Sequence, residues 1–207
     1  GLSKVCPDSI AMTIPMLFND AEEAVWVRER MEDYFMRQAR ERGFEILAWT
    51  NQGYTYCFSK DRVVDFATLR ESKPWELEKD NLSRAFFAAE SIPAVPLGIS
   101  DVNTALESGL VRTVFAPPTG MLIMQWHTRV KHRLDMGIFY SFGVAVITNG
   151  QWDKIAEGHK KVVKEAFGRH IPSLNAAIEK QNSDALKALD SRLEVLKPSG
   201  QRSEERR

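Results

Sequence analysis

The stretch that decides the fold is GIFYSFGVAVIT, residues 137–148. It is an almost unbroken apolar run rich in β-branched and aromatic residues, which is typical of a strand covered on both faces. The pair Asn149-Gly150 predicts a turn after it, and residues 151–194 are expected to be helical almost throughout. Pro172 should start a new helix or kink a long one. A buried strand followed by a helix favours an α/β fold.

Working back towards the N-terminus, the first clear helix begins at Asp20. Asp20 and Glu23 have the spacing of a capping box, and Gly43 is expected to end the helix. The next segment, GFEILAWTNQGYTYCFS at residues 43–59, reads as two strand pieces around a bend at Asn51-Gln52-Gly53. Helix and strand patterns therefore alternate from the start of the chain.

The middle of the chain continues this alternation. Strands are predicted at residues 92–97 and 110–116, with helices between the strands and a further helix at residues 121–132. Strands that alternate with helices of about ten residues indicate βαβ units and a mainly parallel sheet.

Composition excludes several classes of protein. The 28 basic and 28 acidic residues cancel, so no overall charge directs the chain to nucleic acid or to an anionic membrane. No apolar stretch reaches the roughly 18 residues that a membrane span needs. Cys6 and Cys57 leave two alternatives open, a single disulfide or two buried free thiols.

The sequence offers no catalytic machinery. The four histidines have no metal-ligand spacing, and there is no nucleophile elbow, phosphate-binding loop or dinucleotide fingerprint. We therefore expect no cofactor, no metal and no enzymatic activity.

Six segments in order resemble the TRAP-transporter periplasmic solute-binding proteins (DctP-like family). They are IAMTIPMLFNDAEEA at 10–24, GFEILAWTNQGYTYCFS at 43–59, TLRESK at 68–73, IPAVPL at 92–97, ALESGLVRT at 105–113 and QWDKI at 151–155. The resemblance covers about residues 1–190. It implies a periplasmic-binding-protein-like fold of two lobes, with lobe one incomplete and long C-terminal helices.

The resemblance also implies a division of the chain and a function. The expected parts are the remainder of lobe one at 1–48, lobe two at 49–133, a strand returning to lobe one at 134–150, C-terminal helices across both lobes at 151–196, and a mobile tail at 197–207. The implied function is the extracytoplasmic capture of a small organic acid or related solute by hinge closure, in the periplasm. The implied partners are the TRAP membrane permease subunits, and a homodimer is also expected.

One departure from the family concerns the binding site. The family usually places an arginine, which grips a solute carboxylate, where this chain has Trp75. The nearest replacement cation in the sequence is Arg112, but abundant aromatic surface favours a less acidic, more apolar solute. The candidate ligand-binding residues are Trp49, Tyr54, Trp75, Arg112, Gln125 and Trp126.

Two other functions stay open from the sequence. The long C-terminal helix could pair with a partner, which would make the chain an interaction or scaffold protein. An enzyme on an α/β scaffold is the other alternative, and a nucleophile–base pair in one cleft would favour it.

Overall fold

The computed structural model describes residues 2–199, which form two compact units. Unit 1 holds the residues up to Tyr54 together with Phe139–Asn182. Unit 2 holds Thr55–Ile138 together with the residues from Ser183 onward. The finer lobe boundaries predicted from the sequence stay predictions, and the expected tail lies mostly outside the described residues.

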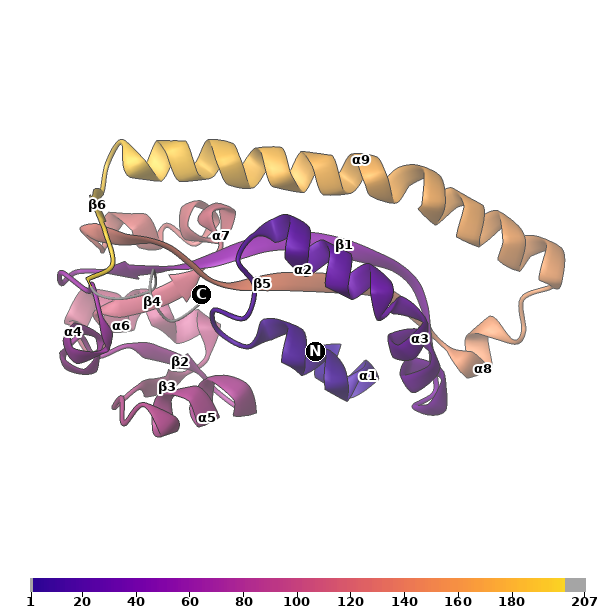
Figure 1. Ribbon diagram of the computed structural model, residues 1–207, viewed down its shortest axis with the longest axis horizontal. Helices are drawn as coiled ribbons and strands as arrows, with labels where there is room; N and C mark the ends of the chain where they lie inside the picture. The colour runs from indigo at the N-terminus through magenta and orange to yellow at the C-terminus, as the bar shows by residue number, and fades with distance from the viewer. Residues whose placement is uncertain (1, 200–207) are drawn as a thin grey trace. The chain divides into compact units, whose positions relative to one another are not determined.

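Three long elements each contribute residues to both units (Figure 1). They are the strands β1 (Phe44–Ser59) and β5 (His132–Thr148) and the helix α9 (Glu157–Asp190). The strand predicted at 137–148 is confirmed as part of β5, which begins five residues earlier. The α/β fold class is therefore confirmed, and so is the long C-terminal helix.

Unit 1 packs its short helices against its parts of β1 and β5. These helices are α1 (Leu2–Val5), the 3-10 helix η1 (Pro7–Thr13), α2 (Ala21–Arg30), α3 (Glu32–Glu41) and α8 (Asn149–Trp152). The core is apolar and aromatic, and its buried members include Phe35, Ile46, Trp49, Tyr140 and Phe142. Burial of these side chains is the main source of stability in this unit.

Unit 2 has a hydrophobic core of its own. Its elements are α4 (Phe66–Glu71), β2 (Trp75–Leu77), α5 (Asn81–Ala89), β3 (Val95–Leu97), η2 (Ile99–Asp101), α6 (Val102–Ser108), β4 (Thr113–Ala116), α7 (Pro118–Ile123), η3 (Trp126–Thr128) and β6 (Glu194–Leu196). The core includes Phe58, Trp75, Leu106, Met121 and Leu189.

The sheets are mixed, which corrects part of the sequence prediction. One sheet has the strand order β4-β1-β5-β6, and a two-stranded sheet pairs β2 with β3. The β2–β3 and β5–β6 pairs are parallel, and Pro74 forms a parallel bridge to Thr113 at the start of β4. However, β1 pairs with β4 in antiparallel fashion. The parallel rule applies to strands joined by helical crossovers, and β1 enters unit 2 before the first of them.

The prediction of two strand pieces within residues 43–59 is wrong, because β1 is one continuous strand of 16 residues. The irregularity is confined to Gly53, whose φ of +89° is a conformation that side chains other than glycine's rarely adopt. Helix α9 compensates for it: the backbone N–H of Asn51 donates to Asn175 Oδ1 at 3.0 Å, and Asn182 Nδ2 donates to the Gln52 carbonyl at 2.9 Å. The two asparagines stabilise the strand on the N-terminal side of Gly53.

Other boundaries also differ from the prediction. The helix expected from Asp20 to Gly43 is split at Met31 into α2 and α3, although Asp20 does cap α2 by accepting from the Glu23 N–H at 2.8 Å. Asn149-Gly150 opens α8 rather than forming a turn. The helix expected at 121–132 is replaced by the end of α7, η3 and the start of β5.

Helix α9 runs for 34 residues without ending at Pro172. Leu174 is 45% exposed, whereas its neighbour Asn175 accepts a hydrogen bond from the Asn51 N–H of β1. At the C-terminal end of the helix, in unit 2, Arg133 of β5 donates to both carboxylate oxygens of Asp190 at 2.6 and 2.9 Å. Polar contacts therefore hold both the middle and the C-terminal end of α9.

Both cysteines are free and buried, which settles the two alternatives in favour of free thiols. Among residues 2–199, no helix is long and apolar enough to cross a membrane.

Candidate functional site

The sequence-predicted binding residues fall into two groups, one in each unit. Trp49 and Tyr54 of β1 belong to unit 1. Trp49 is almost fully buried, and its ring centroid lies 5.7 Å from that of Phe35. The guanidinium carbon of Arg28 lies 5.8 Å from the centroid of the Trp49 ring. Tyr54 packs edge-on against Tyr140 at 5.2 Å. These two rings are part of the unit 1 core in this structure.

Trp75 and Trp126 come together in unit 2. Their rings meet edge to face with centroids 5.4 Å apart, a favoured arrangement for aromatic pairs. The indole N–H of Trp75 donates to the Leu97 carbonyl at 3.0 Å, which fixes its orientation. The ring of Trp75 therefore has a fixed orientation, and its one polar group already donates a hydrogen bond within the chain.

Arg112 is engaged within unit 2 by Asp61. Its guanidinium Nε donates to Asp61 Oδ2 at 2.6 Å, and Nη2 donates to the other carboxylate oxygen, which makes a two-pronged ion pair. The Arg112 hydrogen bonds hold the pKa of the Asp61 carboxyl below its usual value. This fork is therefore occupied and neutralised inside the chain.

Gln125 is an exposed residue between α7 and η3. It has a positive φ of 57°, and its carbonyl accepts from the Thr128 hydroxyl at 2.8 Å. Gln125 and Trp126 are thus adjacent in sequence but differ in burial: Trp126 lies in the core and Gln125 faces solvent.

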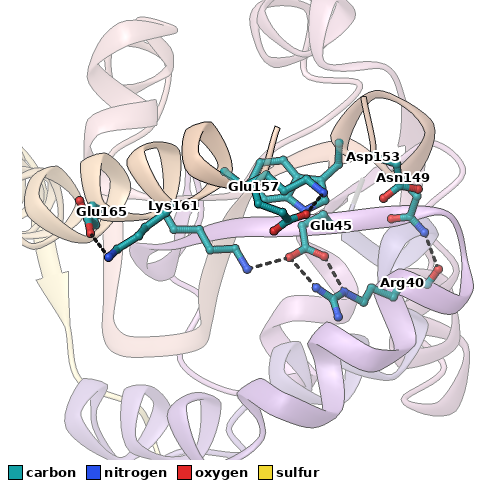
Figure 2. Close-up of a pocket in the computed structure, with 10 residues that line it drawn as sticks. Arg40, Glu45, Asn149, Asp153, Glu157, Lys161 and Glu165 are labelled. Carbon is teal, nitrogen blue, oxygen red and sulfur yellow. Dashed lines mark hydrogen bonds and ion pairs between the residues drawn. The ribbon is translucent and has the colours of Figure 1, made fainter. Parts of the chain in front are cut away.

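A pocket in unit 1 gathers ten residues, none of which is among the candidate ligand-binding residues predicted from the sequence (Figure 2). It has a volume of 620 Å³, within the usual range of small-molecule sites. Its wall comes from the end of α3, the start of β1, α8 and the first turns of α9, and consists of Arg40, Glu45, Asn149, Trp152, Asp153, Glu157, Lys160, Lys161, Lys164 and Glu165.

Glu45 is the buried centre of this pocket wall. Arg40 donates to both of its carboxylate oxygens at 2.6 and 2.9 Å, and Lys164 Nζ lies 3.3 Å from Oε1 (Figure 2). The Arg40 hydrogen bonds outweigh the desolvation of the buried carboxylate, so the pKa of Glu45 is lowered. Asn149 supports Arg40 by donating to its carbonyl at 2.9 Å.

Trp152 forms the aromatic part of the wall. The ammonium groups of Lys160 and Lys164 lie 5.8 and 5.7 Å from its ring centroid, within the range of cation–π attraction. The spacing of Trp152, Lys160 and Lys164 on α8 and α9 was visible in the sequence. Their meeting with Glu45 was not, because more than a hundred residues separate Glu45 from Lys164.

Metal chemistry has no support in the described part of the chain. Within residues 2–199, no three histidine, cysteine, aspartate or glutamate side chains are grouped so that they could hold a metal ion.

Comparison with known proteins gives the chain its family. The model of the family described as bacterial extracellular solute-binding protein, family 7 (DctP), matches residues 1–204. The chain belongs to this family. Family 7 consists of solute-binding proteins rather than enzymes, and it is extracytoplasmic.

A curated relative agrees with this assignment. The family 7 chain is 22% identical over 172 residues to a protein named solute-binding protein from Verminephrobacter eiseniae (strain EF01-2). The match covers 83% of this chain and 51% of the relative. The chain thus spans about half the length of that relative.

Solved structures show the same fold. The TRAP periplasmic solute-binding protein from Haemophilus influenzae RdAW, with bound L-gulonate, matches with a TM-score of 0.86 at 20% identity, over 96% of this chain and 66% of that one. The protein from Xanthobacter autotrophicus Py2, with bound β-D-galacturonate, matches with a TM-score of 0.86 at 16% identity, over 96% of this chain and 67% of that one. The protein from Desulfovibrio salexigens, with bound orotic acid, matches with a TM-score of 0.81 at 21% identity, over 97% of this chain and 64% of that one.

Proposed function

We propose that this family 7 chain belongs to the extracytoplasmic solute-binding component of a TRAP transporter, which captures a small organic acid or a related solute. The observation that carries the proposal is the family match over residues 1–204. The fold relatives with bound L-gulonate, β-D-galacturonate and orotic acid support an acidic small molecule as the class of solute. The chain itself would break no bond, and it would act in the periplasm with TRAP membrane permease subunits.

For the solute, we propose a compound less acidic and more apolar than a dicarboxylate. Trp75 cannot neutralise a carboxylate, and the Arg112 fork is already filled by Asp61. The proposed ligand contacts stay the six candidates from the sequence, which are Trp49, Tyr54, Trp75, Arg112, Gln125 and Trp126. The hinge closure that the family resemblance implies stays a prediction.

A thermal-shift screen tests both parts of this proposal. The panel contains small dicarboxylates, aromatic acids and aliphatic monocarboxylates, because a ligand that binds only the folded state raises the melting temperature. We expect the largest rise with an aromatic or monocarboxylic acid.

The matched variants are Trp75→Phe and Trp26→Phe. Trp75→Phe is preferable to alanine, because emptying a buried tryptophan site would cost about 3–5 kcal/mol of stability. Trp26 is 55% exposed and is not among the proposed contacts. The smaller ring at position 75 should weaken solute binding by about 1 kcal/mol. The proposal fails if no acid shifts the melting temperature, or if every shift is the same in Trp75→Phe as in the unchanged chain.

The predicted homodimer is a separate proposal. Its basis is the apolar stripe of the C-terminal helix, which needs a covering surface. Light scattering that gives the mass of one chain at high concentration would refute it.

A further inference from the structure

We propose that His132 is a pH-sensitive latch for the C-terminal strand β6 of unit 2, which the protonated imidazole holds more firmly than the neutral one. Strand β6 follows α9 closely and pairs in parallel with the first residues of β5, His132–Leu134. The latch therefore joins the end of the long helix to the start of a long strand within one unit. The proposal does not depend on the solute-binding role.

The backbone attachment of β6 is short. The strand has three residues, and the N–H of Glu194 donates to the Lys131 carbonyl at 2.9 Å. Beyond the strand, the N–H of Ser199 donates to the Val64 carbonyl at 2.9 Å. Because so short a strand has few backbone hydrogen bonds, its side-chain contacts contribute much of its attachment. Leu196 supplies the apolar contact, since it is buried, and Glu194 supplies the charged one.

Glu194 makes two charged contacts of different exposure. Its Oε1 pairs with Arg62, and its Oε2 lies 3.2 Å from His132 Nδ1. The side chain of His132 is only 13% exposed, whereas those of Glu194 and Arg62 are 51% and 61% exposed. Water therefore screens the contact with His132 less than the contact with Arg62.

The proton on His132 decides the character of its contact with Glu194. Nδ1 is buried, and despite the short distance it makes no hydrogen bond. A neutral imidazole has one nitrogen without a proton, whereas an imidazolium presents two N–H groups and a positive charge. Imidazole is the side chain that ordinarily gains or loses its proton between about pH 5 and 8. Protonation of His132 thus adds a charge-assisted attraction to Glu194.

Two carboxylates lie near the imidazole, and both hold their charge in mild acid. The hydrogen bond from Arg62 lowers the pKa of the Glu194 carboxyl, and the nearby His132 contributes. The hydrogen bonds from Arg112 lower the pKa of Asp61, again with a contribution from His132. Both acids therefore stay ionised down to about pH 5, so His132 is the member of this group that changes its charge between about pH 5.5 and 7.5.

The other charged groups on the packed segments do not compete for this role. Aspartate, lysine and arginine ordinarily keep their charge throughout this range of pH. Arg133, which follows His132 in β5, is directed to Asp190 and Asp135. The remaining groups on these segments are Lys60, Asp65, Lys131, Arg192 and Lys197.

Hydrogen exchange of backbone amides, followed by nuclear magnetic resonance, tests the latch. The N–H groups of Glu194 and Ser199 report the attachment of β6 and of the chain after it. The N–H of Val111, which donates to the Ala105 carbonyl at 3.1 Å, reports the rest of unit 2. Each exchange rate, measured at pH 5.5 and at pH 7.5, is divided by that of an unprotected amide at the same pH. We expect protection at Glu194 and Ser199 to be about two- to fivefold higher at pH 5.5, from one charge-assisted contact, and protection at Val111 to stay the same.

Three variants assign the effect to His132. His132→Gln keeps a polar side chain that stays neutral, and Glu194→Gln removes the charge that His132 faces, so each should abolish the dependence on pH. Glu194→Gln also loses the pair with Arg62, but arginine keeps its charge throughout this range, so that loss does not vary with pH. His159→Gln is the matched control, because His159 is an exposed histidine of unit 1 and should leave the dependence unchanged.

Three results would overturn the proposal. One is equal or lower protection of the Glu194 and Ser199 amides at pH 5.5 in the unchanged chain. Another is an equal change at Val111, which would show that pH alters the stability of the whole unit. The third is a dependence on pH that persists in Glu194→Gln, whose substituted side chain is half exposed and whose folding is checked by circular dichroism.

Discussion

Glu45 is an acidic side chain held almost fully away from water by its cationic neighbours. Its side chain is 2% exposed, whereas those of Arg40 and Lys164 are 58% and 49% exposed. Because the partners are half solvated, the net stabilisation lies in the lower part of the range for charge-assisted hydrogen bonds. We expect Glu45→Gln to lower the free energy of unfolding by about 1–2 kcal/mol at neutral pH. Urea unfolding measures this difference in the free energy of unfolding. Substitution of the exposed Glu71 by glutamine is the control, and it should change the free energy of unfolding little.

The same contact makes a prediction about pH. The pKa of Glu45 is lowered in the folded chain, so its ion pairs stabilise the fold fully above the carboxyl's ordinary pKa. This stabilisation is lost as the pH falls through the lowered value. The difference between the unchanged chain and Glu45→Gln should therefore be constant near neutrality and shrink in acid, below about pH 4. A difference that grows in acid would contradict the assignment.

Cys57 is a thiol whose chemistry is fixed by burial. Desolvation raises its pKa to about 12, and burial also raises the pKa of Cys6. Since the thiolate is the reactive form, Cys57 should not react with a thiol reagent at pH 8 while the chain is folded. Two thiols should titrate after unfolding in denaturant without reductant. A single mass lower by two hydrogens, which would mean a disulfide, would show this to be wrong.

At the scale of elements, the backbone of β1 at Gly53 depends on glycine. A Cβ on Gly53 would lie 2.9 Å from Asn182 Nδ2, and its positive φ disfavours any side chain. Gly168 is the matched control, because it lies on exposed helix α9 with no atom within 4 Å of an added Cβ. We expect Gly53→Ala to destabilise the chain by about 1–2 kcal/mol and Gly168→Ala to stabilise it by up to about 1 kcal/mol. Thermal unfolding of both variants shows whether each substitution raises or lowers the melting temperature. A lower melting temperature for Gly168→Ala with no change for Gly53→Ala would contradict the role assigned to Gly53.

Elements with strong local patterns were predictable from the sequence. The apolar run at residues 137–148 and the Asp20 cap both appear in the structure. Features that depend on distant partners were not predictable. Asn51-Gln52-Gly53 reads as a break, because the asparagines that stabilise it lie in α9, more than a hundred residues away. The contact of Asn175 with β1 was not predictable for the same reason, since its hydrogen bond to the Asn51 N–H cannot be inferred from hydropathy.

The candidate site shows the same limit. The sequence located the aromatic residues, but only the structure shows that Trp75 pairs with Trp126 and that Asp61 occupies Arg112. The Glu45 pocket was missed because Glu45 and the lysines beside it lie more than a hundred residues apart in the sequence. Charge neighbours that meet through the fold leave no local motif.

At the scale of the whole molecule, the central claim is that the chain belongs to a protein that binds a small organic acid. The family match over residues 1–204 supports that claim, and the fold is shared with solved solute-binding proteins. Native mass spectrometry of protein purified without denaturation tests it most directly. We expect one small organic acid bound per chain, released on mild activation and bound less by Trp75→Phe. Only the ligand-free mass, before and after incubation with the acid panel, would contradict the claim.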